Sequence, residues 1–150
     1  MIGISSGAAT LVVMVGQTVQ CLIDLCDSYR NARLSLLDLV TNLKAFKTAW
    51  IKVKDWASRE VEMSQKTQSD AAVEHLLAYV EMSKLVVDLI CEDLDRLDVP
   101  TSNKKSPLRW RPSGKAAALL FLHEKIIRQH CERVHRQSVS LNLLLSTLQL

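Results

Sequence analysis

The sequence predicts an all-α protein: a single domain that forms an antiparallel bundle of about four long helices. Two observations carry this prediction. The 150 residues include only four glycines and three prolines, and the prolines all fall between residues 100 and 112. The rest of the chain therefore has long runs without a helix breaker. Within those runs, apolar residues recur every three or four positions, which is the spacing of one helix face.

The first predicted helix spans about residues 3–26 and is almost free of charge. The first charged side chain is Asp24, and the first positive one is Arg30. The face opposite the apolar one carries hydroxyls and amides and is interrupted by Val13, so the helix is weakly amphipathic. The apolar face consists of Ile4, Ala8, Leu11, Val15, Val19, Leu22 and Cys26.

Three more helices are predicted, at about residues 32–58, 69–98 and 114–148. The second has an apolar stripe from Leu36 to Ala57 and is followed by a polar connection that begins near Arg59. The third has a wide apolar face, which predicts a central helix touched by several neighbours. The fourth repeats apolar residues every seven positions from Leu120 to Leu148, which favours packing against antiparallel neighbours.

A loop at residues 99–113 is expected between the third and fourth helices. Ser106-Pro107 predicts a short helical turn within it, because proline fits the first position of a helix. An Arg-Trp-Arg segment follows at 109–111. Its arginine stems could cover the tryptophan ring and cap the bundle. Alternatively, the segment could lie at the level of lipid headgroups.

The net charge of +3 is unevenly distributed. Residues 67–103 carry two basic and eight acidic side chains, whereas residues 104–150 carry nine basic and two acidic ones. The acidic and basic helices could simply face each other and solvent, or the basic segment could meet an anionic partner. A further hypothesis is an electrostatic latch between the two segments that includes Asp93 and Asp95 and opens when the domain docks on lipid. We expect no nucleic acid partner, because the basic loop has one aromatic residue and no helix-turn-helix signature is present.

Nothing in the sequence indicates an enzyme, a cofactor or a metal site. The glycines are isolated and form no phosphate-binding loop. Cys131 and His135 offer at most half of a metal site, and zinc needs three or four ligands. The four cysteines form no CxxC pair, which is typical of small core residues in a reduced intracellular protein. They are Cys21, Cys26, Cys91 and Cys131.

The uncharged N-terminal segment is compatible with two environments. A secretory signal would need a positive N-terminal region, and myristoylation would need glycine in place of Ile2. Hydroxyls, amides and three glycines make the segment marginal as a permanent membrane span. It is therefore either the buried first helix of a bundle, or a bundle helix that can also enter a bilayer because it lacks charges. The GxxxG spacing of Gly3 and Gly7 permits close helix packing.

Two stretches carry a resemblance to a known family. They are the uncharged first helix followed by LIDLCDSYRNA at 22–32, and LRWRPSGKAAALLFLHEKIIRQHCERVHRQSVSLNLLLSTLQL at 108–150. With them the chain resembles the HeLo-like domain, the fungal N-terminal domain of STAND (NLR-like) receptors. The resemblance spans nearly the whole chain and rests on helix patterns and short strings rather than on a catalytic motif.

The resemblance implies a non-enzymatic executioner of programmed cell death, in innate immunity or heterokaryon incompatibility. Such a domain forms the N-terminal part of a longer receptor and is cytoplasmic until it is clustered. A nucleotide-binding oligomerisation module in cis, or an amyloid-signalling partner, causes the self-association. The domain then inserts its first helix, here Ile2–Ile23, into the plasma membrane. The inserting side chains would be Ile4, Leu11, Val12, Val15, Val19 and Leu22.

The resemblance also implies contact with anionic lipids near the fourth helix. The side chains expected to make that contact are Lys104, Lys105, Arg109, Trp110, Arg111, Lys115 and Arg128. One departure concerns ion selectivity: related plant funnels depend on acidic residues in the first helix, and here only Asp24 is available, at its far end. The alternative function is that of an adaptor, a helical protein-interaction module with no membrane activity.

Overall fold

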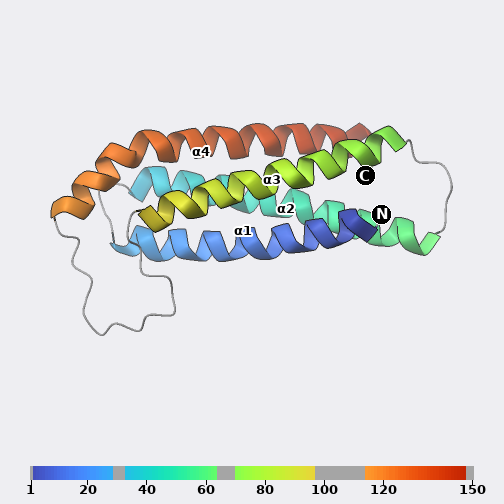
Figure 1. Ribbon diagram of the computed structural model, residues 1–150, viewed down its shortest axis with the longest axis horizontal. Helices are drawn as coiled ribbons and strands as arrows, with labels where there is room; N and C mark the ends of the chain where they lie inside the picture. Colours follow the sequence, from blue (N-terminus) through green and yellow to red (C-terminus); the bar gives the residue numbers. More distant parts are fainter. Residues whose placement is uncertain (1, 29–32, 64–69, 97–113, 148–150) are drawn as a thin grey trace.

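The computed structural model is a bundle of four helices that run alternately in opposite directions (Figure 1). It describes residues 2–28, 33–63, 70–96 and 114–147, and these contain no strand. The predicted all-α antiparallel bundle is therefore confirmed, whereas the helical turn expected within 99–113 lies outside the described residues. The helices are α1 (Ile2–Ser28), α2 (Arg33–Met63), α3 (Asp70–Arg96) and α4 (Gly114–Thr147).

The four helices pack as a closed ring in the order α1, α2, α4, α3. The α1–α2 contact is the most extensive, and the α3–α4 contact is the smallest. Within the described ranges, the backbones of the diagonal pairs α1/α4 and α2/α3 do not approach each other. Each helix therefore packs its backbone closely against two neighbours, and α3 has the least extensive contact with its own.

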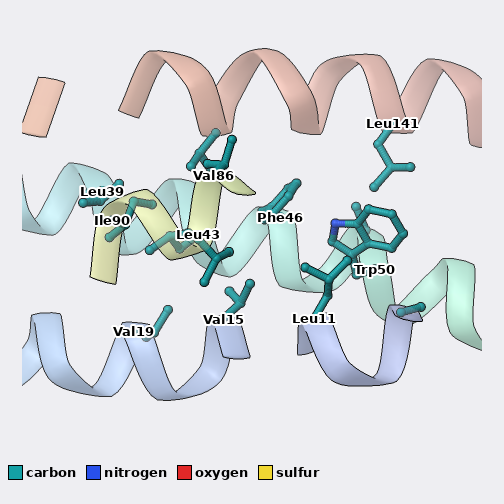
Figure 2. Close-up of a cluster of buried hydrophobic side chains, with 14 of the residues drawn as sticks. Leu11, Val15, Val19, Leu39, Leu43, Phe46, Trp50, Val86, Ile90 and Leu141 are labelled. Atoms are coloured by element: carbon teal, nitrogen blue, oxygen red, sulfur yellow. The ribbon is translucent and has the colours of Figure 1, made fainter. Parts of the chain in front are cut away.

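The core lies along the axis of this ring and receives side chains from all four helices (Figure 2). The apolar faces predicted for the first two helices are buried as expected. Phe46 and Trp50 meet edge to face, with ring centroids 6.2 Å apart and planes at 88°. Each fully buried side chain of this size contributes about 1.5–3 kcal/mol to stability. The residues labelled in Figure 2 are Leu11, Val15, Val19, Leu39, Leu43, Phe46, Trp50, Val86, Ile90 and Leu141.

Two expectations about the helices are corrected. The segment from Arg59 onward, expected to be a connection, continues α2 to Met63, because it is rich in helix formers and has no breaker. The third helix, expected to be central, has close backbone contacts with α1 and α4 but not with α2 within the described ranges. Its apolar face is wide, but only part of that face enters the core. Leu77, Met82 and other apolar side chains remain exposed.

The seven-residue repeat predicted for the fourth helix is confirmed over the side chains that the structure describes. Ile127, Val134 and Leu141 are buried, and Ser138 and Leu145 are buried between them. All four cysteines are free thiols. The repeat thus directs α4 toward α2 and α3.

Candidate functional site

The side chains expected to enter a membrane belong to α1 and face the interior of the bundle. Ile4, Leu11, Val15 and Leu22 are inaccessible to solvent. Val19 is also buried and Val12 is half-buried against the same core. These side chains can reach a bilayer only if α1 leaves α2 and α3.

By length and composition, α1 is able to cross a membrane. Its segment Gly3–Asp27 comprises 25 residues and contains an 18-residue stretch with a mean hydropathy of 1.6. A helix of about 20 apolar residues spans the hydrocarbon core of a bilayer. The core helix of a soluble bundle meets the same criteria, so α1 fits both environments that the sequence indicates.

Three polar side chains of α1 are bonded within the helix itself, while Ser5 lies 3.5 Å from Ser58 of α2. The Thr10 hydroxyl donates to the Ser6 carbonyl at 3.0 Å, and the Thr18 hydroxyl donates to the Met14 carbonyl at 2.9 Å. The Gln20 amide donates to a carboxylate oxygen of Asp24 at 3.1 Å. A bond within one helix travels with that helix, so these groups stay satisfied in any solvent.

The contact between α1 and α3 is built from small side chains on two parallel helices. A Cβ added to Gly7 would lie 2.7 Å from Cγ1 of Val80, so the glycine allows the two backbones to approach closely. Further along, the Thr18 hydroxyl lies 3.5 Å from the Cys91 sulfur. The GxxxG spacing noted in the sequence therefore serves the packing of α1 on α3.

A shallow hollow lies beside this contact, between the C-terminal halves of α1 and α3. Met14, Cys21, Val87 and Leu94 are among its lining residues. Burial raises the pKa of the Cys21 thiol, and the neighbouring Cys91 raises it further. The Cys21 thiol therefore stays protonated at neutral pH and is a poor nucleophile.

The expected lipid-contacting set is only partly described. Lys104, Lys105, Arg109, Trp110 and Arg111 lie outside the described residues. Lys115 lies in the first turn of α4. Arg128 is exposed on α4, the helix diagonal to α1. The structure therefore does not bring Arg128 together with the membrane-insertion residues.

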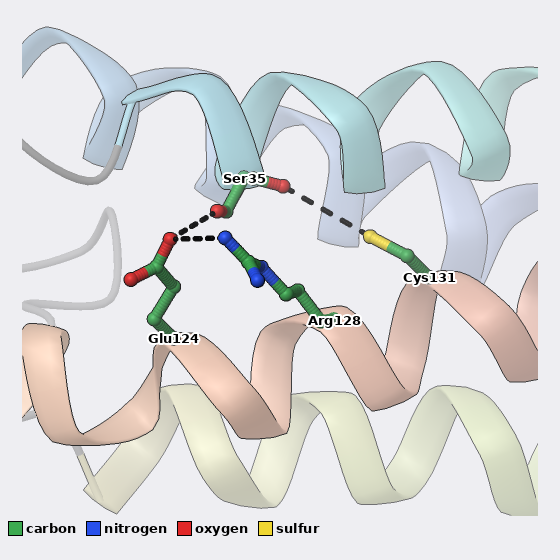
Figure 3. Close-up of polar contacts among 4 residues, drawn as sticks. All are labelled: Ser35, Glu124, Arg128 and Cys131. Atoms are coloured by element: carbon green, nitrogen blue, oxygen red, sulfur yellow. Dashed lines mark hydrogen bonds and ion pairs between the residues drawn. The ribbon is translucent and has the colours of Figure 1, made fainter.

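Arg128 belongs to a small polar cluster between α2 and α4 (Figure 3). Its guanidinium lies 3.0 Å from a carboxylate oxygen of Glu124, which also accepts a hydrogen bond from the Ser35 hydroxyl at 3.2 Å. The Cys131 thiol faces the Ser35 carbonyl at 3.9 Å. The positive charge of Arg128 is thus partly balanced within its own helix, which weakens its attraction for lipid.

The link between the acidic and basic helices is a specific contact that sequence reasoning missed. His130 is only 4% exposed, and its Nε2 lies 2.6 Å from Asp93 Oδ2. The Ser83 hydroxyl donates to the Gln137 side chain at 3.2 Å. Asp95 is exposed and forms no ion pair with α4 among the described residues. Between the described parts of α3 and α4, the side-chain bonds are therefore Asp93–His130 and Ser83–Gln137.

A sequence signal for the buried histidine did exist. His130 follows Ile127 by three positions and precedes Val134 by four, so it shares their buried face. Within the described ranges, no three His, Cys, Asp or Glu side chains converge on a common point that could hold a metal.

No protein-family model, curated protein sequence or solved structure matches this chain. Function is therefore inferred from the contacts of α1, α3 and α4. Those contacts define a helix that is uncharged before Asp24, in which Thr10, Thr18 and Gln20 have hydrogen-bond partners within the helix. They also define a neighbouring helix, α3, with weak support.

Proposed function

We propose that this chain is a membrane-active helical bundle of the HeLo-like kind: a non-enzymatic cell-death domain whose α1 enters a bilayer after forced clustering. The observation that carries the proposal is the bonding of α1 within itself. Thr10, Thr18 and Gln20 have partners four residues away on the same helix. Transfer to lipid therefore leaves these three intrahelical hydrogen bonds intact.

The charge distribution of α1 favours the same transfer. Charged side chains are the most costly groups to place in a membrane, at about 2.5–3.5 kcal/mol each at the bilayer centre on insertion scales. The segment that precedes Asp24 contains none. Asp24 itself would lie at the end of the inserted helix, where water is available.

The resting state is stable because the departure of α1 would expose apolar surface of the remaining helices to water. Its apolar face exchanges one apolar environment for another, since lipid tails are as apolar as a protein core. The faces of α2 and α3 that α1 covers would instead be exposed to water. Clustering by a nucleotide-binding module in cis, or by an amyloid-signalling partner, would offset the free-energy cost of this exposure. The helix α1 would then insert into the plasma membrane, which contains anionic lipids.

The alternative is an adaptor in which α1 never leaves the bundle. A disulfide between α1 and α3 separates the two functions. The Thr18 hydroxyl already lies 3.5 Å from the Cys91 sulfur, and a disulfide bond is about 2.05 Å long. The variant Thr18→Cys in a Cys21→Ser background is therefore expected to form a bond with Cys91 after a small side-chain adjustment.

The first prediction is that this disulfide blocks membrane activity reversibly. The full chain carrying an inducible clustering tag is added to dye-loaded vesicles of phosphatidylcholine and phosphatidylserine. We expect dye release from the reduced variant, no release after oxidation with diamide, and recovery with dithiothreitol. Peptide mapping under non-reducing conditions verifies the 18–91 bond.

The matched control carries the additional substitution Cys91→Ser, which removes the disulfide and leaves the rest of the variant unchanged. This control is expected to release dye under both conditions. Equal release from the oxidised and reduced disulfide variant would show that α1 need not leave the bundle. No release from any clustered form would favour the adaptor function.

A further inference from the structure

The outward face of α3 carries an apolar strip that no other helix covers. The strip consists of Ala78, Met82, Leu85 and Leu89, which are separated by four, three and four positions and so share one face. Met82 is 55% exposed, Leu85 63% and Leu89 42%. A continuous apolar strip of this kind on a soluble protein marks an interaction surface.

An acidic border runs along the side of the strip that faces α1. Leu77 marks that side of α3, because its Cδ2 atom lies 3.8 Å from the position of a Cβ added to Gly3. Glu81 lies one helical turn after Leu77, and Asp88 follows seven positions later on the same side. Both carboxylates are exposed.

A basic border runs along the opposite side of the strip and comes from α4. Arg136 lines a hollow that it shares with Ala78 and Met82. Arg133 lies between the two α4 side chains that bond to α3, three positions after the first and four before the second, so it faces the same helix. Both arginines are exposed, and Arg136 lies 4.0 Å from a carboxylate oxygen of Glu132 on its own helix, so among the described residues Arg133 carries the unpaired charge of this border.

Asp88 and Arg133 lie at the same height along the bundle. The Asp93–His130 and Ser83–Gln137 bonds fix the register of α3 against α4. Asp88 is midway between the α3 ends of these two bonds, and Arg133 is close to midway between their α4 ends. Within the described ranges no ion pair engages either side chain, so both charges are available to a partner.

We propose that two copies of this chain associate through the strip, with their α3 helices parallel about a two-fold axis that runs along it. This axis places the acidic border of each copy opposite the basic border of the other, so Asp88 meets Arg133 of the second copy twice. A two-fold axis across the strip would make the helices antiparallel and would bring like charges together, which is unfavourable. Charge complementarity therefore selects the parallel arrangement.

The parallel dimer has a geometric consequence for α1. Rotation about an axis parallel to the helices keeps both bundles pointing in the same direction. The N-termini of both α1 helices therefore lie at the same end of the dimer. The inference itself does not rest on the proposed membrane function, because it concerns the resting surface of α3 and α4 and is tested without lipid.

The second prediction is a charge exchange across this interface. Asp88→Lys alone places two positive side chains together and is expected to weaken dimerisation by about tenfold or more. The double variant Asp88→Lys/Arg133→Glu restores opposite charges and is expected to recover the dissociation constant of the original chain to within about threefold. Sedimentation velocity over a concentration series measures both, and added salt should weaken the original dimer.

The apolar strip has its own matched pair of variants. Leu85→Gln is expected to give a monomer, whereas Leu34→Gln, on α2 at an 81% exposed position, is expected to leave the dimer intact. Circular dichroism verifies that each variant is folded. Met82→Cys and Leu89→Cys should each cross-link to the same residue of the second copy, because every strip residue meets its own equivalent in a parallel dimer.

Several results would overturn the proposal. The first is a chain that stays monomeric at all concentrations, and the second is a double variant that dimerises no more tightly than Asp88→Lys alone. The third is cross-linking that occurs only when the Met82→Cys and Leu89→Cys variants are mixed. A monomeric chain whose binding to anionic vesicles depends on Leu85 would instead assign the strip to lipid. None of these results bears on whether a disulfide between α1 and α3 blocks dye release, so the two proposals fail independently.

Discussion

Two glycines of α1 have different surroundings although they belong to the same helix. Gly7 is buried, and an added Cβ would lie 2.7 Å from Cγ1 of Val80, a short branched side chain that is itself buried. At Gly16 the nearest atom would be the Lys47 Nζ at 3.4 Å, the far end of a flexible chain. The first neighbour cannot move cheaply, whereas the second can.

The third prediction follows from this difference. Gly7→Ala is expected to destabilise the bundle, because overpacking costs about 1–3 kcal/mol while alanine regains only about 1 kcal/mol of helix propensity. Gly16→Ala gains the same propensity without the clash and should be up to about 1 kcal/mol more stable. Urea unfolding of both variants measures the difference. Equal effects at the two positions would show that the Gly7–Val80 contact does not limit packing.

Cys131 shows how burial controls a thiol. Removal from water, together with the nearby Asp38 carboxylate, raises the pKa of Cys131 from an ordinary value of 9.0 to about 11. Only the thiolate reacts with alkylating agents. In the folded protein the Cys131 thiol is therefore almost entirely protonated near neutral pH.

The fourth prediction concerns the rate of Cys131 alkylation. At pH 8 the thiolate fraction should be about 100-fold lower than in the unfolded chain, so iodoacetamide should label Cys131 about 100-fold more slowly. Peptide mass spectrometry isolates this cysteine from the others. The raised pKa also makes the free energy of unfolding depend on pH. The stability that the protonated Cys131 thiol contributes is fully present below about pH 9 and is lost as the pH rises toward 11. Equal labelling of folded and unfolded chain would contradict the burial.

At the scale of elements, α2 and α3 have opposite roles. Of the described helices, α2 supplies the most buried apolar side chains and packs on both α1 and α4. α3 has the smallest helix–helix contact of the ring and exposes part of its apolar face. Local stability follows the amount of buried contact, so the two helices should open at different rates.

The fifth prediction is an order of hydrogen exchange. Amides in α3 should exchange at least about tenfold faster than those in the centre of α2, because α3 opens with less loss of buried contact. Mass spectrometry of peptic peptides, at concentrations where the chain is monomeric, gives both rates from one sample. Equal protection of the two helices would mean that the bundle opens only as a whole.

Hydrophobic periodicity predicts the faces of these helices but not their neighbours. The spacing from Leu36 to Ala57 was enough to identify the buried face of α2, because geometry fixes which residues share a face. The position of α3 could not be obtained in this way. An apolar side chain such as Leu85 has the same periodicity whether it meets the core or a second molecule.

At the scale of the whole molecule, the fold follows from the sequence more fully than the site does. Four helices and their alternating directions follow from the breakers and apolar stripes. The partner of His130 depends on the register of α3 against α4, which no local pattern encodes. The bonding of Thr10 and Thr18 within α1 was accessible in principle, since a threonine in a helix can donate to the carbonyl four residues before it.

The two proposals describe one assembly at this scale. A parallel dimer would present the N-termini of two α1 helices at the same end, each packed against α2 and α3 of its own copy. Further clustering would then bring together dimers rather than single bundles. The exposed strip of α3 would already be covered by the second copy before α1 leaves its bundle.

The close approach at Gly7 also constrains how this chain can change over generations. Because an added methyl group would collide with Val80, a larger residue at position 7 becomes tolerable only when position 80 carries a smaller one. Substitutions at positions 7 and 80 should therefore covary among homologous sequences. This covariation should persist after the surface residues of those sequences have diverged.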